Sequence, residues 1–267
     1  MPQFTKGYAA IADGQVHYRL RPGDGVPVVL LHQTASSGAM WERVMAALPA
    51  GRPLYALDTP GFGGSFDPPV GPSLDEYARW IGEAIAALGL TRPHVAGHHT
   101  GASIAAALNM QQPDLCRSLA LIGPGYADAA ERAAMAQRFG KPFRPVRSGA
   151  YLLKNWEYLR VGGADADIAL LHREMVDQLR AHATRPDAYA AVWQADSIAA
   201  FEAIRCPALI MAARDDVMFP SFERARAARP DIAAIELSGG ANFEPDLVSG
   251  EVAAALAAHF DRVEGRP

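Results

Sequence analysis

The stretch Val95-Ala96-Gly97-His98-His99-Thr100-Gly101-Ala102-Ser103 decides the fold of this chain. It joins an apolar strand pattern to an alanine-rich helical pattern through a turn centred on His99. Gly97 and Gly101 stand two positions before and two positions after His99, where the lack of a Cβ lets a strand and a helix approach closely. The spacing therefore predicts a sharp strand-turn-helix that carries the His99 side chain at its exposed tip.

Outside this turn, short β-rich runs alternate with amphipathic helical patterns, which is typical of a mostly parallel sheet with helices on both faces. The runs 9–11 and 15–20 flank an Ala-Asp-Gly turn and are expected to form an antiparallel hairpin at the sheet edge. Six further runs are apolar throughout, as strands buried on both faces are, namely 26–31, 54–57, 94–97, 119–122, 208–212 and 232–237. Helices are expected near 40–48, 74–88, 100–112, 222–228 and 252–260, and Ser73 with Glu76 predicts a capping box at the start of the second.

Residues 124–197 interrupt this rhythm, because they contain several helical patterns and no strand pattern. Aromatic residues are also concentrated there, and most of them are expected to hold the helices together. We expect Trp156, Tyr189 and Trp193 from this segment to face a pocket. The segment is predicted to be a helical cap inserted into an α/β core that is formed by residues 1–123 and 198–267.

Three motifs in chain order carry a resemblance to a known family. The turn around His99 resembles the nucleophile elbow of the α/β-hydrolase fold. Leu30-Leu31-His32-Gln33-Thr34 resembles the oxyanion loop of that fold, although Gln33 stands where the family usually has glycine. The stretch from Leu57 to Ser65 is similar to the family's Asp-x-x-Gly-x-Gly-x-Ser loop.

The resemblance covers residues 8–263 and is strongest to the capped branch that includes epoxide hydrolases, haloperoxidases and C–C hydrolases. It implies an α/β-hydrolase fold with an eight-stranded, mostly parallel sheet, helices on both faces and a helical cap. It also implies that Asp216 is the acid of the catalytic triad, because Asp216 fits the spacing to Pro220 better than Asp215 does.

Two catalytic positions also depart from the family pattern. His99 occupies the place of the nucleophilic serine, and Asn242, followed by Phe243, occupies the place of the triad histidine. Acyl transfer needs a nucleophile with a removable proton and a base beside it, and neither is present in its usual position. The resemblance therefore implies the fold without implying serine-dependent hydrolysis.

A dyad of His99 and Asp216 is the chemistry that the remaining residues favour. A buried carboxylate without a partner is strongly destabilising, and His99 and the amide of Asn242 are the partners available to Asp216. We expect a His99–Asp216 hydrogen bond that leaves the other ring nitrogen to move a proton. If the loops keep the family geometry, the backbone N–H groups of Thr34 and Thr100 would form an oxyanion hole.

The remaining polar residues near these motifs have other expected roles. His32 is expected to support the oxyanion loop, and His98 to pack sideways beside the elbow. Because His98 and His99 are adjacent on a sharp turn, they would be poor ligands of one metal ion, and no metal site is predicted. Ser103 lies one helical turn beyond the elbow and is disfavoured as a replacement nucleophile. The pocket-lining candidates are His32, Gln33, His98, Trp156, Tyr189, Trp193, Asn242 and Phe243.

Composition and charge narrow the classes of partner. The chain has 267 residues, of which 50% are hydrophobic and 20% charged, and its formal net charge is −4 with the two signs interspersed. A nucleic-acid partner is therefore not expected, since a basic stripe is missing. No signal pattern or apolar run of membrane-spanning length is seen, so we expect a cytoplasmic protein without a membrane partner. No cofactor is predicted, and homo-oligomer formation stays open.

Three functions from different classes fit these observations. The leading one is a cofactor-free enzyme that uses His99, paired with Asp216, as general base/acid in place of a serine nucleophile on a small carbonyl or ester-like compound, with hydrolase or lyase chemistry. The alternative is a catalytically silent homologue that binds a small ligand in an intact pocket. The third is a structural or assembly role, for which large exposed apolar patches would be the distinguishing feature.

Overall fold

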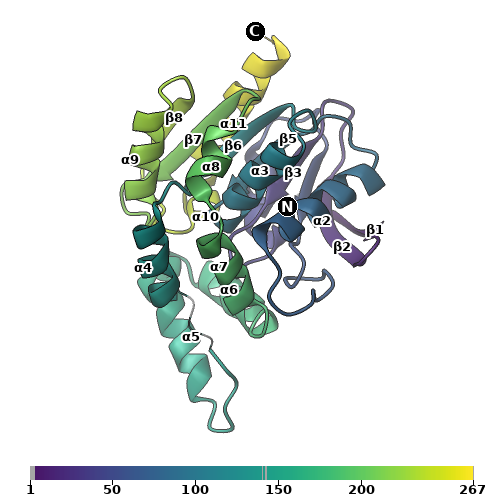
Figure 1. The fold of residues 1–267 in the computed structure, drawn as a ribbon. Coiled ribbons are helices and arrows are strands. Elements are labelled where there is room, and N and C mark those ends of the chain that lie inside the picture. The colour runs from purple at the N-terminus through teal and green to yellow at the C-terminus, as the bar shows by residue number, and fades with distance from the viewer. Residues whose placement is uncertain (1–3, 140, 142, 267) are drawn as a thin grey trace.

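A computed structural model describes residues 4–139, 141 and 143–266 of the chain. The described residues form one eight-stranded sheet with the strand order β1-β2-β4-β3-β5-β6-β7-β8 (Figure 1). The strands are β1 Thr5–Ile11, β2 Gly14–Arg21, β3 Val28–Leu31, β4 Leu54–Leu57, β5 His94–His98, β6 Ser118–Ile122, β7 Ala208–Ala213 and β8 Ala233–Leu237.

The sheet topology confirms the α/β-hydrolase fold predicted from the motifs. β1 and β2 form the expected antiparallel hairpin at one edge, and β2 also pairs antiparallel with β4. All the other neighbouring strands are parallel. Because parallel strands end at the same edge of a sheet, the residues that follow β3, β5, β6, β7 and β8 are brought together there.

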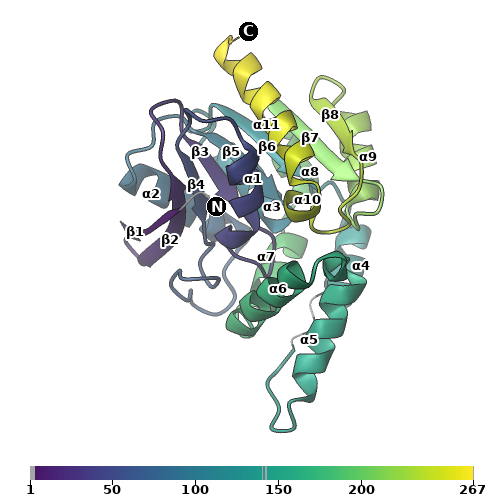
Figure 2. The ribbon, with the colours of Figure 1, turned by 180° about the vertical axis from the view of Figure 1, so that it is seen from behind.

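The two faces of the sheet are covered by different helices. In β3, Val29 and Leu31 pack on one face and Val28 and Leu30 on the other, which is the alternation of a strand buried on both sides. Helices α2 and α3 cover the first face (Figure 1), and α1 and α11 cover the second (Figure 2). Their bounds are α1 Glu42–Ala47, α2 Leu74–Ala87, α3 Thr100–Gln111 and α11 Ser249–Glu264.

The helix ends agree with the sequence signals in one case and differ in another. The predicted capping box is confirmed, since Ser73 accepts from the Glu76 backbone N–H and the Glu76 carboxylate accepts from the Ser73 N–H. The predicted helix 40–48 is instead a 3₁₀ turn, η1 Gly38–Trp41, followed by α1. The Ser37 hydroxyl accepts from Ala39 N–H at 3.3 Å, and this turn begins at Gly38, two residues earlier than the pattern indicated.

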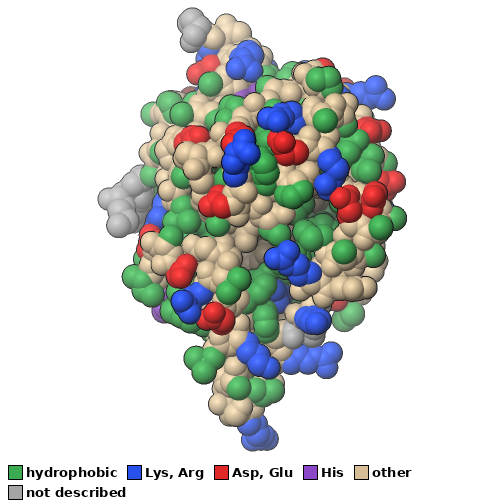
Figure 3. Space-filling model, turned by 90° about the vertical axis from the view of Figure 1, so that its left-hand side faces the viewer, with side chains coloured by type: hydrophobic (Ala, Val, Ile, Leu, Met, Phe, Trp, Pro, Cys, Tyr) green, Lys and Arg blue, Asp and Glu red, His purple; other side chains and the backbone are tan. Residues whose placement is uncertain are grey.

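Between β6 and β7 the described residues contain helices and no strand. These elements are α4 Ala129–Phe139, α5 Ala150–Val161, η2 Ala164–Ala166, α6 Ile168–Arg180, α7 Arg185–Gln194 and α8 Ser197–Glu202, followed after β7 by α9 Phe219–Ala228 and α10 Glu244–Leu247. Helix α5 projects away from the sheet (Figures 1 and 2). On the side shown in Figure 3, acidic and basic side chains are interspersed over the upper part of the view, whereas Lys and Arg side chains predominate at its lower end.

No helix among the described residues is both long enough and apolar enough to cross a bilayer.

Candidate active site

His99 lies on the tight turn between β5 and α3. Its backbone torsions are φ 47° and ψ −106°, a conformation that residues other than glycine rarely adopt. A Cβ on Gly97 would lie 2.3 Å from the Gly101 carbonyl carbon, and a Cβ on Gly101 would lie 2.2 Å from the Leu31 carbonyl oxygen. Both glycines are therefore required by the close approach of strand and helix, and the strained turn directs His99 toward a cavity that it lines.

The imidazole of His99 contacts the carboxylate of Asp216. His99 Nε2 lies 2.9 Å and 3.0 Å from the two carboxylate oxygens, and the Met218 backbone N–H donates to one of them at 2.8 Å. The Asp216 side chain is fully buried, whereas its neighbour Asp215 is exposed. His99 Nε2 thus donates to Asp216, and no hydrogen bond joins His99 Nδ1 to another residue within the described ranges.

Gly123, the residue after β6, makes room for this contact. It has φ +59°, and a Cβ there would lie 2.3 Å from His99 Cδ2 and 3.0 Å from Asp216 Oδ2. The sequence reasoning missed this position, although a glycine directly after an apolar strand was a visible signal. The His99–Asp216 contact therefore depends on a glycine that comes from a neighbouring strand.

A second pair of buried residues, His98 and Glu244, lies beside the dyad. His98 Nε2 is 2.9 Å from Glu244 Oε2, and both side chains are fully buried. The ring of His98 stacks on that of His99 with 4.1 Å between centroids and 28° between planes. Burial and the neighbouring His99 hold the pKa of His98 well below its usual value. Glu244 was not among the residues singled out from the sequence.

These four side chains also have the composition of a metal site. One donor atom from each of His98, His99, Asp216 and Glu244 lies within 4.8 Å of the others. The two rings are stacked, however, and their Nε2 atoms contact separate carboxylates, Glu244 for His98 and Asp216 for His99.

The residues expected to form the oxyanion hole, Thr34 and Thr100, contact each other. The Thr34 N–H donates to Thr100 Oγ1 at 3.3 Å, and the Thr100 hydroxyl donates to Thr34 Oγ1 at 2.9 Å. Thr100 is the first residue of α3, where backbone N–H groups have no partner within the helix. The two threonines therefore lie together at the floor of the cavity beside His99.

The neighbouring loop residues have their own partners. Asn242 does not join the dyad, because its side-chain oxygen accepts from Val217 N–H at 3.1 Å. Gln33 donates from Nε2 to the Asn242 carbonyl at 2.9 Å, which ties the loop after β3 to the loop after β8. His32 accepts from Thr59 N–H at Nε2 and donates from Nδ1 to the Gln33 carbonyl, and burial lowers its pKa.

The cavity has a volume of about 290 Å³. Among the pocket-lining candidates, Gln33, Tyr189, Trp193, Asn242 and Phe243 line it, while His32, His98 and Trp156 lie outside its wall. His32 and His98 are buried beneath the loops, and Trp156 packs against a small hydrophobic cluster in the helical insertion. The other lining residues are Thr34, Ala35, His99, Thr100, Ser103, Met135, Arg138, Phe139, Tyr158, Leu159, Val161, Gly162, Glu174, Gln178, Val192, Val217 and Met218.

Residues of the helical insertion also contact the loop after β3. The Tyr189 hydroxyl donates to the Thr34 carbonyl at 3.1 Å, and its oxygen lies 3.2 Å from the Tyr158 hydroxyl. The Arg185 guanidinium stacks over both tyrosine rings, at 4.7 Å from the Tyr158 centroid and 5.1 Å from that of Tyr189. The helical insertion therefore contacts Thr34, which lines the same cavity as His99.

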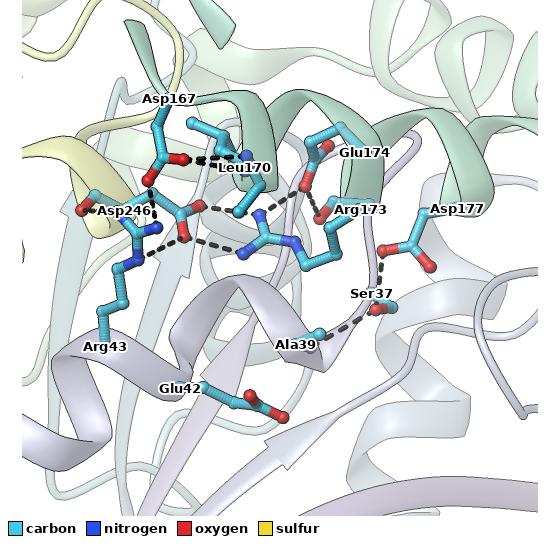
Figure 4. Close-up of polar contacts among 12 residues, drawn as sticks. Ser37, Ala39, Glu42, Arg43, Asp167, Leu170, Arg173, Glu174, Asp177 and Asp246 are labelled. Atoms are coloured by element: carbon cyan, nitrogen blue, oxygen red, sulfur yellow. Dashed lines mark hydrogen bonds and ion pairs between the residues drawn. The ribbon is translucent and has the colours of Figure 1, made fainter. Parts of the chain in front are cut away.

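Helix α6 is joined to the core by buried and half-buried charged side chains (Figure 4). Arg173 donates to both oxygens of Asp246 at 2.7 Å and also contacts Glu174. The Ser37 hydroxyl donates to Asp177 at 2.8 Å. Burial and the nearby Glu174 raise the pKa of Asp177 to about 7, because a second ionised carboxylate in the same place is unfavourable.

Comparisons with known proteins agree with this architecture. A family model described as "alpha/beta hydrolase fold" matches residues 26–231, and the chain belongs to this family. "Putative carbamate hydrolase RutD" of Azorhizobium caulinodans is 28% identical over 250 residues, which cover 88% of this chain and 91% of that protein. "(E)-2-((N-methylformamido)methylene)succinate hydrolase" of Acinetobacter baylyi is 29% identical over 123 residues, which cover 46% of each chain.

Solved structures share the fold at lower sequence identity. The crystal structure of E-2-(acetamidomethylene)succinate hydrolase has a TM-score of 0.80 at 19% identity and covers 97% of this chain and 100% of that one. The enol-lactonase from Burkholderia xenovorans has a TM-score of 0.74 at 20% identity and covers 95% and 99%. The chain is thus a member of the α/β-hydrolase family with hydrolases among its relatives.

Proposed function

We propose that this protein is a cofactor-free hydrolase of a small carbonyl compound, in which His99 acts as general base on water and Asp216 orients it. The observation that carries the proposal is the contact of His99 Nε2 with both oxygens of Asp216, which leaves Nδ1 as the nitrogen without a protein partner among the described residues. An imidazole held by a carboxylate in one tautomer is a competent general base.

The reaction follows from this arrangement. His99 Nδ1 takes a proton from a water molecule while the water oxygen bonds to the carbonyl carbon of the substrate. The C=O bond opens to an oxyanion, and the imidazolium is stabilised by Asp216. When the oxyanion collapses, the bond to the leaving group breaks and His99 returns the proton to that group.

Thr34 and Thr100 are the proposed donors to the oxyanion. The Thr100 N–H lies at the N-terminus of α3, where the helix dipole favours negative charge. The Thr34 N–H makes only a long bond of 3.3 Å to Thr100 Oγ1, so a substrate oxygen can compete for it. Aimed backbone N–H groups of this kind contribute on the order of 10²–10³ in rate.

The helical insertion is proposed to act as a cap that excludes water and selects small substrates. It supplies four aromatic residues to the lining of the cavity, namely Phe139, Tyr158, Tyr189 and Trp193. A cavity of about 290 Å³ lies at the lower end of the usual range for small-molecule sites, so a small organic compound with a carbonyl group fits it. The hydrolase names of the relatives support an ester, enol-lactone, carbamate or amide of that size.

A panel of such compounds tests the proposal. The wild-type protein is expected to hydrolyse at least one of them without added metal or cofactor. Asp216→Asn should lower kcat by about 10²–10⁴-fold, since the amide no longer fixes the working tautomer of His99.

Ser103→Ala is the matched control. Ser103 lines the same cavity and its hydroxyl donates to the His99 carbonyl at 3.4 Å, yet it has no place in the proposed step. Its kcat should stay within about threefold of the wild type. Loss of activity in Ser103→Ala with full activity in Asp216→Asn would refute the proposal, and tight binding of a compound without turnover would favour a silent ligand-binding protein.

A further inference from the structure

The buried pair His98–Glu244 packs against the His99–Asp216 dyad, because the rings of His98 and His99 stack on each other. The proposed reaction does not use this pair. Glu244 begins the short helix α10, which follows the β8 loop, and its Oε2 lies 2.9 Å from His98 Nε2. Its Oε1 accepts from the Ala213 backbone N–H at 3.4 Å. The Glu244 side chain has no solvent exposure, which is uncommon for glutamate. Without water around it, the neighbouring groups decide whether its carboxyl is ionised or protonated.

Glu244 and Asp216 share one buried site. One donor atom of each lies within 4.8 Å of the other and of both histidines. Two ionised carboxylates at this distance away from water repel each other strongly, so one of them keeps its proton. Asp216 accepts short hydrogen bonds from His99 and from Met218 N–H, which stabilise an anion. The bond that Glu244 accepts from Ala213 N–H is long at 3.4 Å, and the carboxyl of Glu244 shares a side-chain hydrogen bond with Asp216, which requires a proton between the two.

The proton therefore belongs on Glu244. Burial and the adjacent Asp216 both raise the pKa of Glu244 well above its usual value, in agreement with the hydrogen-bond geometry. The groups around this carboxyl are His98 on β5, Ala213 N–H at the end of β7, Asp216 in the loop after β7, the Glu244 backbone N–H and, within 4.8 Å, His99.

His98 completes the pair as a neutral imidazole. Its Nδ1 is buried and makes no hydrogen bond to any described residue. If Nδ1 carried the proton, a buried N–H would have no acceptor, and such orphaned donors are rarer than unused acceptors. The Nε2–H tautomer, which donates to Glu244, avoids that cost.

We propose that Glu244 is a positioning residue for the His99–Asp216 dyad. Together with His98 it forms a neutral, hydrogen-bonded pair that leaves Asp216 as the one anion of this cluster and supports the His99 ring by stacking. A neutral His98 tolerates the imidazolium that forms on His99 during turnover, whereas a charged His98 would repel it. This consequence for catalysis rests on the proposed function, but the charge state of the pair does not.

NMR of the wild-type protein tests the charge state without any substrate. With ¹³C-labelled glutamate, the side-chain carboxyl signal of Glu244 should have the chemical shift of the protonated acid at pH 7. Its assignment follows from its loss in Glu244→Gln, while the control Glu157→Gln, on the exposed side of α5, removes a different signal. With ¹⁵N-labelled histidine, His98 should show the neutral Nε2–H pattern from pH 5 to pH 8. An ionised Glu244 or a protonated His98 at pH 7 would overturn the proposal.

Activity measurements on the substrate found with the panel test the positioning role. Glu244→Gln keeps a neutral hydrogen-bonding group of the same shape, so kcat and its pH profile should stay within about threefold of the wild type. Glu244→Leu should lose about tenfold or more. A collapse of activity in Glu244→Gln, with a displaced pH profile, would show that the site needs an anion at this position and would overturn the proposal.

The two proposals fail in different ways. If no substrate is turned over but the NMR signals are as expected, the neutral pair stands and the hydrolase proposal falls. If turnover depends on Asp216 while Glu244 is ionised, the hydrolase proposal stands and the neutral pair falls.

Discussion

Gly123→Ala is expected to break the dyad by a purely steric effect. The new Cβ would lie 2.3 Å from His99 Cδ2, whereas ordinary contacts begin near 3.4 Å, so the imidazole has to move by about 1 Å. That movement would lengthen the 2.9 Å bond to Asp216 to about 4 Å, which is no longer a hydrogen bond. A displacement of this size at a reacting group costs on the order of 10²-fold in rate.

Gly71→Ala provides the matched control for this substitution. Gly71 has a similar φ of +72°, but a Cβ there would meet nothing within 4 Å. Each alanine costs about 1 kcal/mol for its left-handed backbone, and Gly123→Ala costs a further 1–3 kcal/mol or so for overpacking. In thermal unfolding, Gly71→Ala should lower Tm by about 2–4 °C and Gly123→Ala by clearly more.

The activity and NMR assays decide the outcome. Gly71→Ala should keep its kcat, and Gly123→Ala should lose about 10²-fold together with the NMR signature of the His99–Asp216 hydrogen bond. If Gly123→Ala is as active as Gly71→Ala and equally stable, the reasoning that places His99 and Asp216 against Gly123 is refuted.

Three further predictions concern other features. Fluorophosphonate probes should not label the wild type, as mass spectrometry can check, because the elbow has no hydroxyl nucleophile beside a histidine base. The variant His99→Ser should not become an efficient esterase in an ester assay, because Asn242 cannot act as the base for the new serine. Asp177→Asn should stabilise the protein at pH 8 by at least about 1 kcal/mol but not at pH 4. The folded-state pKa of Asp177, about 7, exceeds the unfolded value of 3.8, so the wild type loses stability as the pH rises between these values. Equal urea midpoints for the wild type and Asp177→Asn at both pH values would contradict this. Ser73→Ala should cost about 1 kcal/mol of unfolding free energy through the lost helix cap, and an unchanged Tm would contradict it.

The sequence was sufficient for the fold because its signals are local and repeated. Eight strand patterns, the turn glycines Gly97 and Gly101 and the capping box at Ser73 each depend on neighbouring residues, and the structure contains all of them. The 3₁₀ turn before α1 was missed because its start depends on a hydrogen bond from Ala39 N–H to the Ser37 hydroxyl.

The surroundings of the site were less accessible from sequence. Glu244 was missed because glutamate is usually exposed, and only packing against His98 and Asp216 explains its burial. Asn242 was considered as a partner of Asp216, but its amide instead holds Val217 N–H. Such contacts join residues distant in the chain, and a periodic pattern carries no information about them.

A single-turnover comparison of His99→Gln with the wild type tests the central claim most directly. Glutamine keeps a polar side chain at the elbow but cannot take up a proton at neutral pH. The account predicts that substrate affinity stays within a few-fold while the rate of the chemical step falls by about 10²–10⁴-fold. A His99→Gln protein that hydrolyses the substrate as fast as the wild type would contradict the claim that His99 is the base.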